Sequence, residues 1–172
     1  MDSPYLDVQI MAMVDENGRS FFAGEDNGDS GAEQQFFSRK TSNSCVIMSK
    51  EVLTAIGQPL SNRVNMVITS EQDHEAPDYM VAENFSEAIR TARMFPSIYV
   101  VGGSELYQES FDYANTLWLL KSKARHAVGE DFLKVPSHYE LEATDELENG
   151  MVVERWVNPD RIVKLYKAPK RH

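Results

Sequence analysis

The chain has 172 residues, of which 42% are hydrophobic and 26% charged, a composition typical of a soluble globular protein. Its formal net charge of −10 argues against nucleic acid as a partner, because binding to phosphates needs a basic surface. No apolar stretch reaches the roughly 18 residues of a membrane helix, and Met1-Asp2-Ser3-Pro4 lacks the basic region of a secretory leader. We therefore expect a cytoplasmic monomer with no nucleic-acid or membrane partner.

A chain of this length fits one domain, and no linker-like or repetitive stretch divides it, so residues 1–172 are expected to form a single domain. The one cysteine, Cys45, cannot form an intramolecular disulfide, which suits a reducing compartment. Its place in an apolar run predicts a buried, inert thiol. We expect no metal site.

The first half of the chain alternates between predicted strands and helices. Residues 8–14 form an apolar run that suits a strand buried on both faces, and Asn17-Gly18 marks a turn. Residues 23–32 are rich in glycine and short acidic side chains, so we expect a mobile loop of the kind that often gates active sites. The elements expected after it are a helix over 33–41 capped by Asp29 or Ser30, a strand over 45–48, a helix over 50–56 ended by Gly57, and a strand over 65–69.

The second half ends in a predicted hairpin. Residues 139–147 and 151–157 roughly alternate in polarity and flank Asn149-Gly150, which is a hairpin signal. The elements expected before it are a strand over 80–81, a helix over 86–94, a strand over 98–101, a helix over 104–109 and a strand over 116–120. This order predicts an α/β fold: a mostly parallel central sheet with an antiparallel C-terminal hairpin and helices on both faces.

The strongest local signal for chemistry is the pair Gly102-Gly103, which joins a buried strand to a helix starting at Ser104. Glycines let the backbone approach a ligand closely, and a helix start offers N–H groups to a phosphate. The segment lacks the glycine spacing of a Rossmann turn and the Gly-Lys-Ser/Thr of a P-loop. It indicates an anion or nucleotide site, and a plain strand-to-helix turn is the alternative.

Three charged residues stand at the start of a helix or strand. Lys50 opposes the helix dipole, which a phosphate partner would explain, although a solvated lysine is an equal alternative. Arg63 precedes a strand, and arginine suits bidentate carboxylate binding, although a solvated arginine fits as well. Glu33 falls in the first turn of a helix, which alone indicates only a favourable helix start.

Taken in this order, these segments resemble the dihydrofolate reductase family over roughly residues 7–158. The two most specific motifs are matched by Ile56-Gly57-Gln58-Pro59-Leu60 with Arg63-Val64-Asn65, and by Val101-Gly102-Gly103-Ser104-Glu105-Leu106-Tyr107. Looser matches are the strand from Val8, the loop Gly24-Glu25-Asp26-Asn27, Glu33 with Phe37, Val46-Ile47-Met48-Ser49-Lys50, and Gly129-Glu130-Asp131-Phe132.

The chain departs from the family pattern at three places. The loop before Glu33 is shorter and lacks the family's Pro-Trp pair, and Ser49 and Lys50 replace a glycine and an arginine. Leu120 stands where the family has a threonine that supports the active-site carboxylate. Without that hydroxyl, Glu33 has one hydrogen-bond partner fewer.

The resemblance implies hydride transfer from NADPH to C6 of 7,8-dihydrofolate with protonation at N5, which gives tetrahydrofolate. Glu33 would be the catalytic residue, Arg63 would clamp the glutamate tail of the substrate, and the Gly102–Gly103 peptide bond would be cis. The substrate-binding residues it implies are Ile10, Met11, Glu33, Phe37, Ile56, Leu60, Arg63, Val101 and Tyr107. The cofactor-binding residues it implies are Ala12, Ser49, Lys50, Glu51, Val52, Thr69, Ser70, Gly102, Gly103, Ser104, Glu105 and Leu106.

Two other functions remain open from the sequence. The first is a sister reductase of the same fold acting on another pterin or on a riboflavin-pathway pyrimidine, since residues 30–37 are also similar to that branch. Arg63 favours folate, because a ribosyl-phosphate substrate has no glutamate to clamp. The second is a non-catalytic nucleotide-binding protein.

Overall fold

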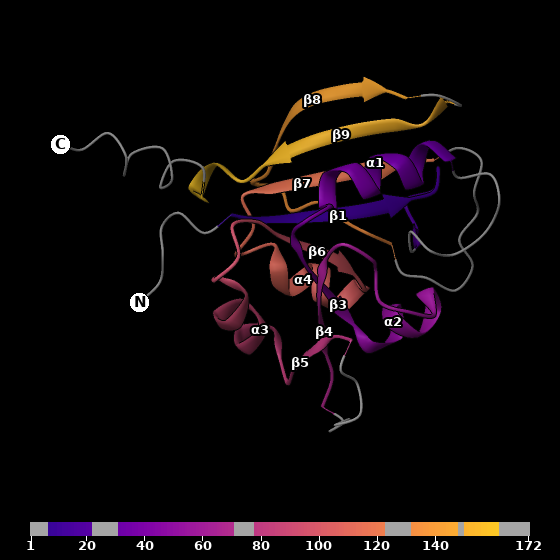
Figure 1. Ribbon diagram of the computed structural model, residues 1–172. Coiled ribbons are helices and arrows are strands. Elements are labelled where there is room, and N and C mark those ends of the chain that lie inside the picture. The colour runs from indigo at the N-terminus through magenta and orange to yellow at the C-terminus, as the bar shows by residue number, and fades with distance from the viewer. Residues whose placement is uncertain (1–6, 22–30, 71–77, 123–131, 148–149, 162–172) are drawn as a thin grey trace.

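The computed structural model describes residues 7–21, 31–70, 78–122, 132–147 and 150–161 (Figure 1). These residues build one mixed sheet with the strand order β5-β4-β3-β6-β1-β7-β9-β8, and β2 pairs with β1 beside that path. The strands that pair in parallel are β1 (Val8–Val14), β3 (Cys45–Ser49), β4 (Val64–Ile68), β5 (Met80–Ala82), β6 (Ile98–Gly102) and β7 (Thr116–Lys121). The antiparallel partners are β2 (Ser20–Phe21), β8 (Glu140–Glu146) and β9 (Val152–Val157). The predicted α/β fold with an antiparallel C-terminal hairpin is confirmed.

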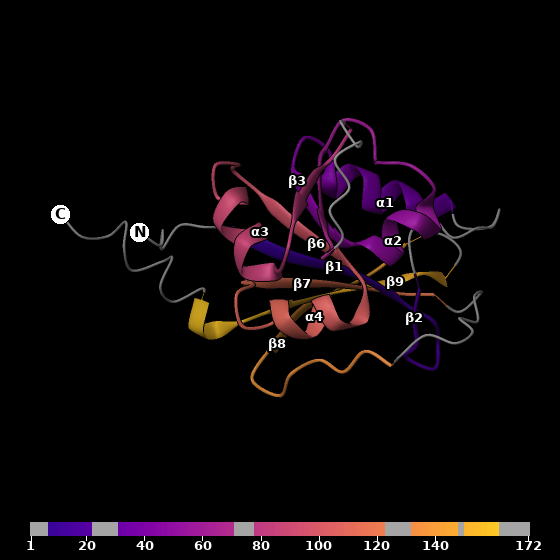
Figure 2. The ribbon, with the colours of Figure 1, turned by 90° about the horizontal axis from the view of Figure 1, so that it is seen from below.

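Helices cover both faces of this sheet (Figure 2). The helices are α1 (Gly31–Thr41), α2 (Lys50–Ile56), α3 (Phe85–Ala92) and α4 (Ser104–Ser110). Successive side chains of a strand point to opposite faces. In β1, Val8 and Ile10 therefore pack with α3 and α4, whereas Met11 packs with α1 and α2. This double burial explains why the strand is almost uniformly apolar.

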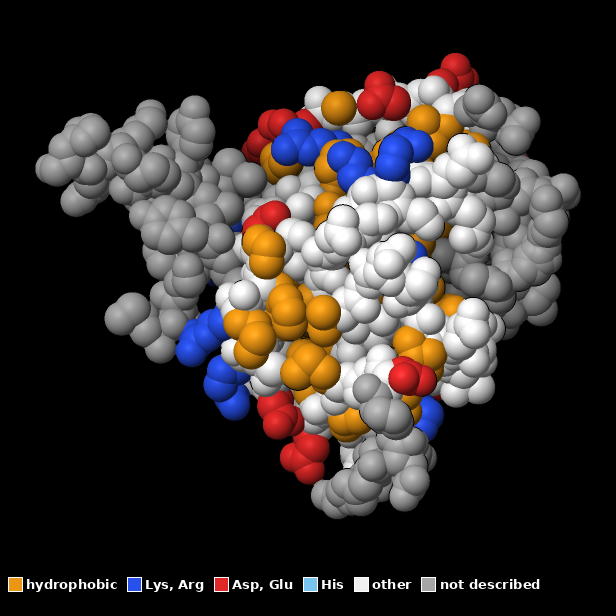
Figure 3. Space-filling model, viewed as in Figure 1, with side chains coloured by type: hydrophobic (Ala, Val, Ile, Leu, Met, Phe, Trp, Pro, Cys, Tyr) orange, Lys and Arg blue, Asp and Glu red, His pale blue; other side chains and the backbone are white. Residues whose placement is uncertain are grey.

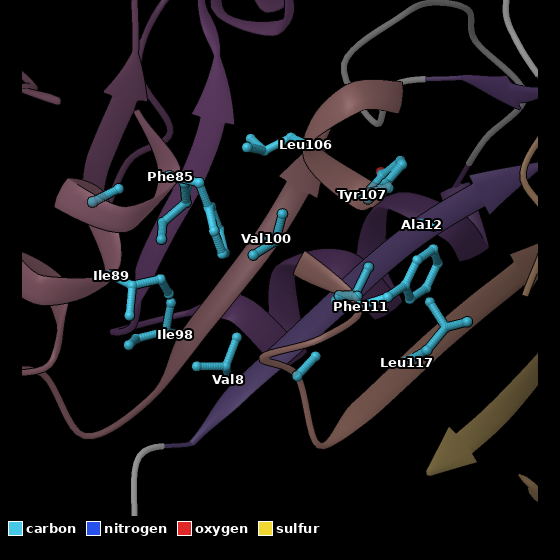
Figure 4. Packing of buried hydrophobic residues seen from close by; sticks show 14 of the residues in the cluster. Val8, Ala12, Phe85, Ile89, Ile98, Val100, Leu106, Tyr107, Phe111 and Leu117 are labelled. Atoms are coloured by element: carbon cyan, nitrogen blue, oxygen red, sulfur yellow. The ribbon is translucent and has the colours of Figure 1, made fainter. Parts of the chain in front are cut away.

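The core between the sheet and α3 and α4 is built from aliphatic and aromatic side chains (Figure 4). Phe85 and Ile89 of α3, together with Leu106 of α4, pack against strand residues such as Val100. Cys45 is fully buried in the same cluster, and burial raises the pKa of its thiol to about 12. The thiol is therefore protonated at neutral pH, as an inert core residue should be.

The boundaries differ from the sequence expectation at a few points. The predicted mobile loop over 23–32 and its caps Asp29 and Ser30 lie outside the described residues, except that the last two loop residues belong to α1. The predicted start of that helix at Glu33 was therefore wrong by two residues. The two-residue strand β2 was not predicted, because it is held only by pairing with β1. No helix in the described ranges is long and apolar enough to cross a membrane.

Basic side chains gather where α1 lies beside β9 (Figure 3). The ammonium of Lys40 lies 4.0 Å from the Trp118 ring centroid, and the Arg155 guanidinium lies 5.8 Å from the same ring. Burial and the nearby charges of Arg155 and Arg39 lower the pKa of Lys40. The aromatic platform offsets this repulsion through cation–π attraction.

Candidate active site

Residues from three distant segments meet at the carboxyl ends of β3, β4 and β6. In the sheet register Ser49 lies opposite Ile68, and Met48 lies opposite Gly102. The segments that leave these strands, Lys50 and Thr69-Ser70 included, therefore start from one edge of the sheet. Ligands of open α/β sheets bind at this edge. The structure thus brings together most of the residues that the sequence assigned to the cofactor.

The turn between β6 and α4 offers backbone donors to an anion. Gly102 has a φ of 137°, a conformation that favours glycine, and the bond to Gly103 is cis as the resemblance implied. No side chain of a described residue caps the start of α4. By contrast, Ser49 caps α2 and Asn84 caps α3 through hydrogen bonds to backbone N–H groups. The first turn of α4 is thus left for another acceptor, which suits a phosphate of a dinucleotide.

The helix α1 presents three of the relevant positions in a row. Positions 33, 37 and 41 are spaced by four residues and so lie on one helix face. Phe37 is 4% exposed and Thr41 is fully buried, which shows that this face is turned to the interior. Glu33 stands at the beginning of the row and Thr41 at its end.

Arg63 meets the end of this row. Its Nη1 donates to the Thr41 hydroxyl over 2.8 Å, and its Nε donates to the Ser61 carbonyl over 2.8 Å. The guanidinium carbon lies 5.9 Å from the Phe37 ring centroid. Burial lowers the pKa of Arg63, and no carboxylate within the described ranges pairs with it. A held, partly desolvated guanidinium of this kind is suited to a carboxylate ligand.

Apolar side chains line the same face of the sheet. The cluster beneath α1 and α2 contains Met11, Phe37 and Val101, with Ile56 and Leu60 packed against it. These are the apolar substrate residues that the sequence singled out on this face. Leu120 also lies fully buried in this cluster, so a hydrocarbon side chain occupies the position where the resemblance implied a threonine.

Other assigned residues lie elsewhere. The side chains of Ile10, Ala12, Leu106 and Tyr107 are buried in the cluster facing α3 and α4, on the opposite side of the sheet from Phe37. The hydroxyl of Tyr107 donates a hydrogen bond to the Met11 carbonyl over 3.1 Å and so supports the strand rather than a ligand.

The remaining assigned residues lie near the sheet edge. Glu51, Ser70 and Glu105 are exposed there, and Val52 is buried in the cluster under α2. Their ligand contacts remain predictions.

Two residues to which the sequence assigned no role in the site shape the Arg63 loop. Thr41 holds the guanidinium, and Asn65 exchanges hydrogen bonds with both backbone groups of Leu60 while donating to the Arg63 carbonyl. Asn65 is 3% exposed, so this amide is committed to the loop. One sequence signal could have indicated Thr41: it lies eight residues after Glu33, which places the two positions on the same face of a helix.

Comparison with known proteins agrees with this geometry. A family profile described as dihydrofolate reductase matches residues 29–150. A dihydrofolate reductase from Bacillus subtilis (strain 168) is 33% identical over 86 residues, which are 50% of this chain and 51% of the relative. One from Ureaplasma parvum serovar 3 is 28% identical over 123 residues, 70% of this chain and 78% of the relative.

A solved structure shares the fold. The dihydrofolate reductase of Enterococcus faecalis, complexed with NADP(H) and RAB-propyl, has a TM-score of 0.77 and 20% identity, and the match covers 88% of this chain and 95% of that one. Among the curated relatives, the match to the Bacillus subtilis enzyme spans about half of that enzyme's length. The family profile extends over well more than half of the present chain. The chain belongs to the dihydrofolate reductase family.

Proposed function

We propose that this protein reduces 7,8-dihydrofolate to tetrahydrofolate with NADPH. The observation that carries the proposal is Arg63, a partly buried guanidinium held by Thr41 and Ser61 at the end of the α1 face that begins with Glu33. With no described carboxylate beside it, this cation favours a substrate that ends in a carboxylate.

The spacing along α1 supports a substrate of this shape. At 1.5 Å per residue, about 12 Å of helix separates position 33 from position 41. Phe37, Ile56 and Leu60 supply apolar surface between the two ends. An extended molecule with a polar head, an aromatic middle and a carboxylate tail matches this order, and dihydrofolate has that order.

The residues at the sheet edge suit the cofactor. NADPH supplies a hydride when bound, while the protein orients it and tunes its surroundings. Ser49, Lys50, Thr69 and Ser70 would hold the adenosine phosphates, with Lys50 as the point charge for the 2′-phosphate. The uncapped start of α4 and the Gly102-Gly103 turn would hold the pyrophosphate and the nicotinamide side.

Glu33 would act at the head of the substrate. A carboxylate at this end of the apolar strip can hydrogen-bond the pterin ring and favour its protonated form at N5. Leu120, at the position where the family resemblance implies a threonine, would offer no hydroxyl to this carboxylate, and it contributes a hydrocarbon side chain to the apolar cluster. Phe37 and Leu60 would exclude water from the reacting carbon.

A spectrophotometric assay tests the proposal. Purified protein should oxidise NADPH when 7,8-dihydrofolate is added and should leave a riboflavin-pathway pyrimidine substrate unreduced. Turnover of the pyrimidine alone would identify a sister reductase, the alternative that similarity over residues 30–37 keeps open. Quenching of protein fluorescence by NADPH without oxidation would identify a nucleotide-binding protein.

We also propose that the protein is a cytoplasmic monomer of one domain. Size-exclusion chromatography with light scattering tests the oligomeric state.

A further inference from the structure

The hydroxyl of Thr41 donates to one fixed partner and accepts from another. It is fully buried and donates to the Phe37 carbonyl over 2.8 Å, and it also lies 2.8 Å from Nη1 of Arg63. A hydroxyl has one hydrogen, and here that hydrogen is donated to the Phe37 carbonyl. The lone pairs of the oxygen therefore face the guanidinium. The direction of the Arg63 bond is therefore set by the helix backbone.

A second bond holds the guanidinium from the other side. Nε donates to the Ser61 carbonyl, so this bond and the bond to Thr41 occupy two of the five N–H groups of the guanidinium. No other hydrogen bond to the guanidinium comes from the described part of the chain, so its remaining N–H groups could serve a ligand. A planar guanidinium held at two points presents its remaining donors in one direction, which suits bidentate binding.

The chain around Arg63 is also tied to the end of α1. The Asn43 N–H donates to the Asn62 carbonyl over 2.9 Å, and the Val64 N–H donates to the Ser44 carbonyl over 3.0 Å. Asn65 braces the same loop from β4. With the backbone secured in this way, the remaining freedom of Arg63 lies in its side chain, which Thr41 restrains.

We propose that Thr41 is a positioning residue that aims Arg63 at the carboxylate tail of the substrate, an inference that rests on the proposed function. Thr41 touches no substrate atom and acts only through the guanidinium. The same hydroxyl donates to the carbonyl of Phe37, so the backbone of α1 fixes the direction from which the hydroxyl accepts the Arg63 hydrogen bond.

Steady-state kinetics of Thr41→Val and Thr41→Ser test this role. Valine keeps the shape and removes the hydroxyl, so KM for dihydrofolate should rise about tenfold with little change in kcat, the pattern of lost uniform binding. Serine keeps the hydroxyl and should restore KM to within about twofold of the parent. A dihydropterin without the glutamate tail should be turned over equally by all three proteins. In an Arg63→Leu background, Thr41→Val should add nothing to KM, since it acts through Arg63.

Thr116→Val is the matched control, because this buried threonine of β7 donates to Asn115, the residue just before the strand, and has no contact with Arg63 among the described hydrogen bonds. It should alter Tm alone. Equal effects of Thr41→Val on tailed and tailless substrates, or additivity with Arg63→Leu, would overturn the inference and make Thr41 merely structural. Folate binding, followed by tryptophan fluorescence, separates the two proposals. If the parent protein binds folate but does not turn over dihydrofolate, the reductase activity is refuted, and a tenfold loss of folate affinity in Thr41→Val would still support the role of Thr41. If the parent protein does not bind folate, both proposals are refuted.

Discussion

At the scale of single residues, Glu33 carries the proposed proton chemistry. Glu33→Gln keeps the size but cannot ionise, so turnover at pH 7 should fall roughly a hundredfold, in the range of general acid–base contributions. The loss should shrink at low pH, where solvent protonates the substrate. NADPH affinity should stay unchanged, because the residues proposed to bind the cofactor lie on other segments. Stopped-flow measurement of hydride transfer across pH checks this.

A neighbouring glutamine serves as the control for Glu33. Gln35 is exposed on the same helix, and Gln35→Ala should leave turnover intact. If Glu33→Gln were as active as the parent at every pH, Glu33 would only favour the helix start. The acid would then be sought in the preceding loop, at Asp26 or Asp29.

Lys50 carries the predicted choice of cofactor. Lys50→Glu places a negative charge near the expected 2′-phosphate, so the preference for NADPH over NADH should be reversed or erased. The ratio of kcat/KM for the two cofactors measures this. Lys134→Glu makes the same change of net charge at an exposed position and should leave the ratio unaltered. An unaltered ratio in Lys50→Glu would reject the role.

At the scale of elements, α3 shows how a short helix is stabilised at its start. The Asn84 side chain accepts a hydrogen bond from the Glu87 N–H over 2.9 Å, and the Glu87 carboxylate accepts one from the Glu83 N–H over 2.7 Å. Asn84→Ala should lower the free energy of unfolding by about 1 kcal/mol, while Asn84→Asp, an equally good cap, should cost little. Urea denaturation measures both, and equal losses in the two variants would show that the side-chain cap is not the cause.

At the scale of the whole molecule, buried groups with raised pKa values set the response to alkali. Burial raises the pKa of Cys45 from 9.0 to about 12, and it raises the pKa of Tyr107 and Tyr139 above the usual 10.0. The unfolded chain thus releases these protons at lower pH than the folded protein does. The contribution of Cys45 should be full below about pH 9 and that of each tyrosine below about pH 10. Above these values each contribution should fall by about 1.4 kcal/mol per pH unit until the pH reaches the pKa of that group in the folded protein.

Two substitutions in β3 isolate the share of the thiol. Cys45→Val removes the ionising group while filling the site, so stability should fall less steeply between pH 9 and 11 than in the parent. Ile47→Val, also fully buried, should lower stability equally at every pH. Urea midpoints over pH 7–11 give both slopes, and identical slopes in Cys45→Val and parent would exclude the thiol as a cause.

The elements and several site residues could be inferred from local sequence patterns. The apolar run of β1, the ending of α2 at Gly57 and the turn at Gly102-Gly103 each depend on the residues of one short segment. Backbone periodicity and glycine's freedom act over a few residues, so these features are visible in the sequence. The order of the segments carried the family resemblance.

Other features depend on contacts between distant segments. The alternation of β1 places Ile10 and Met11 on opposite faces, but which face meets α1 depends on how the helices cross the sheet. Thr41 and Arg63 are 22 residues apart, and their hydrogen bond exists because the end of α1 packs against the loop before β4. A threonine at a helix end has no local property that marks it as a partner of arginine. Local propensities specify the elements, whereas packing of the assembled sheet and helices decides which side chains meet in the site.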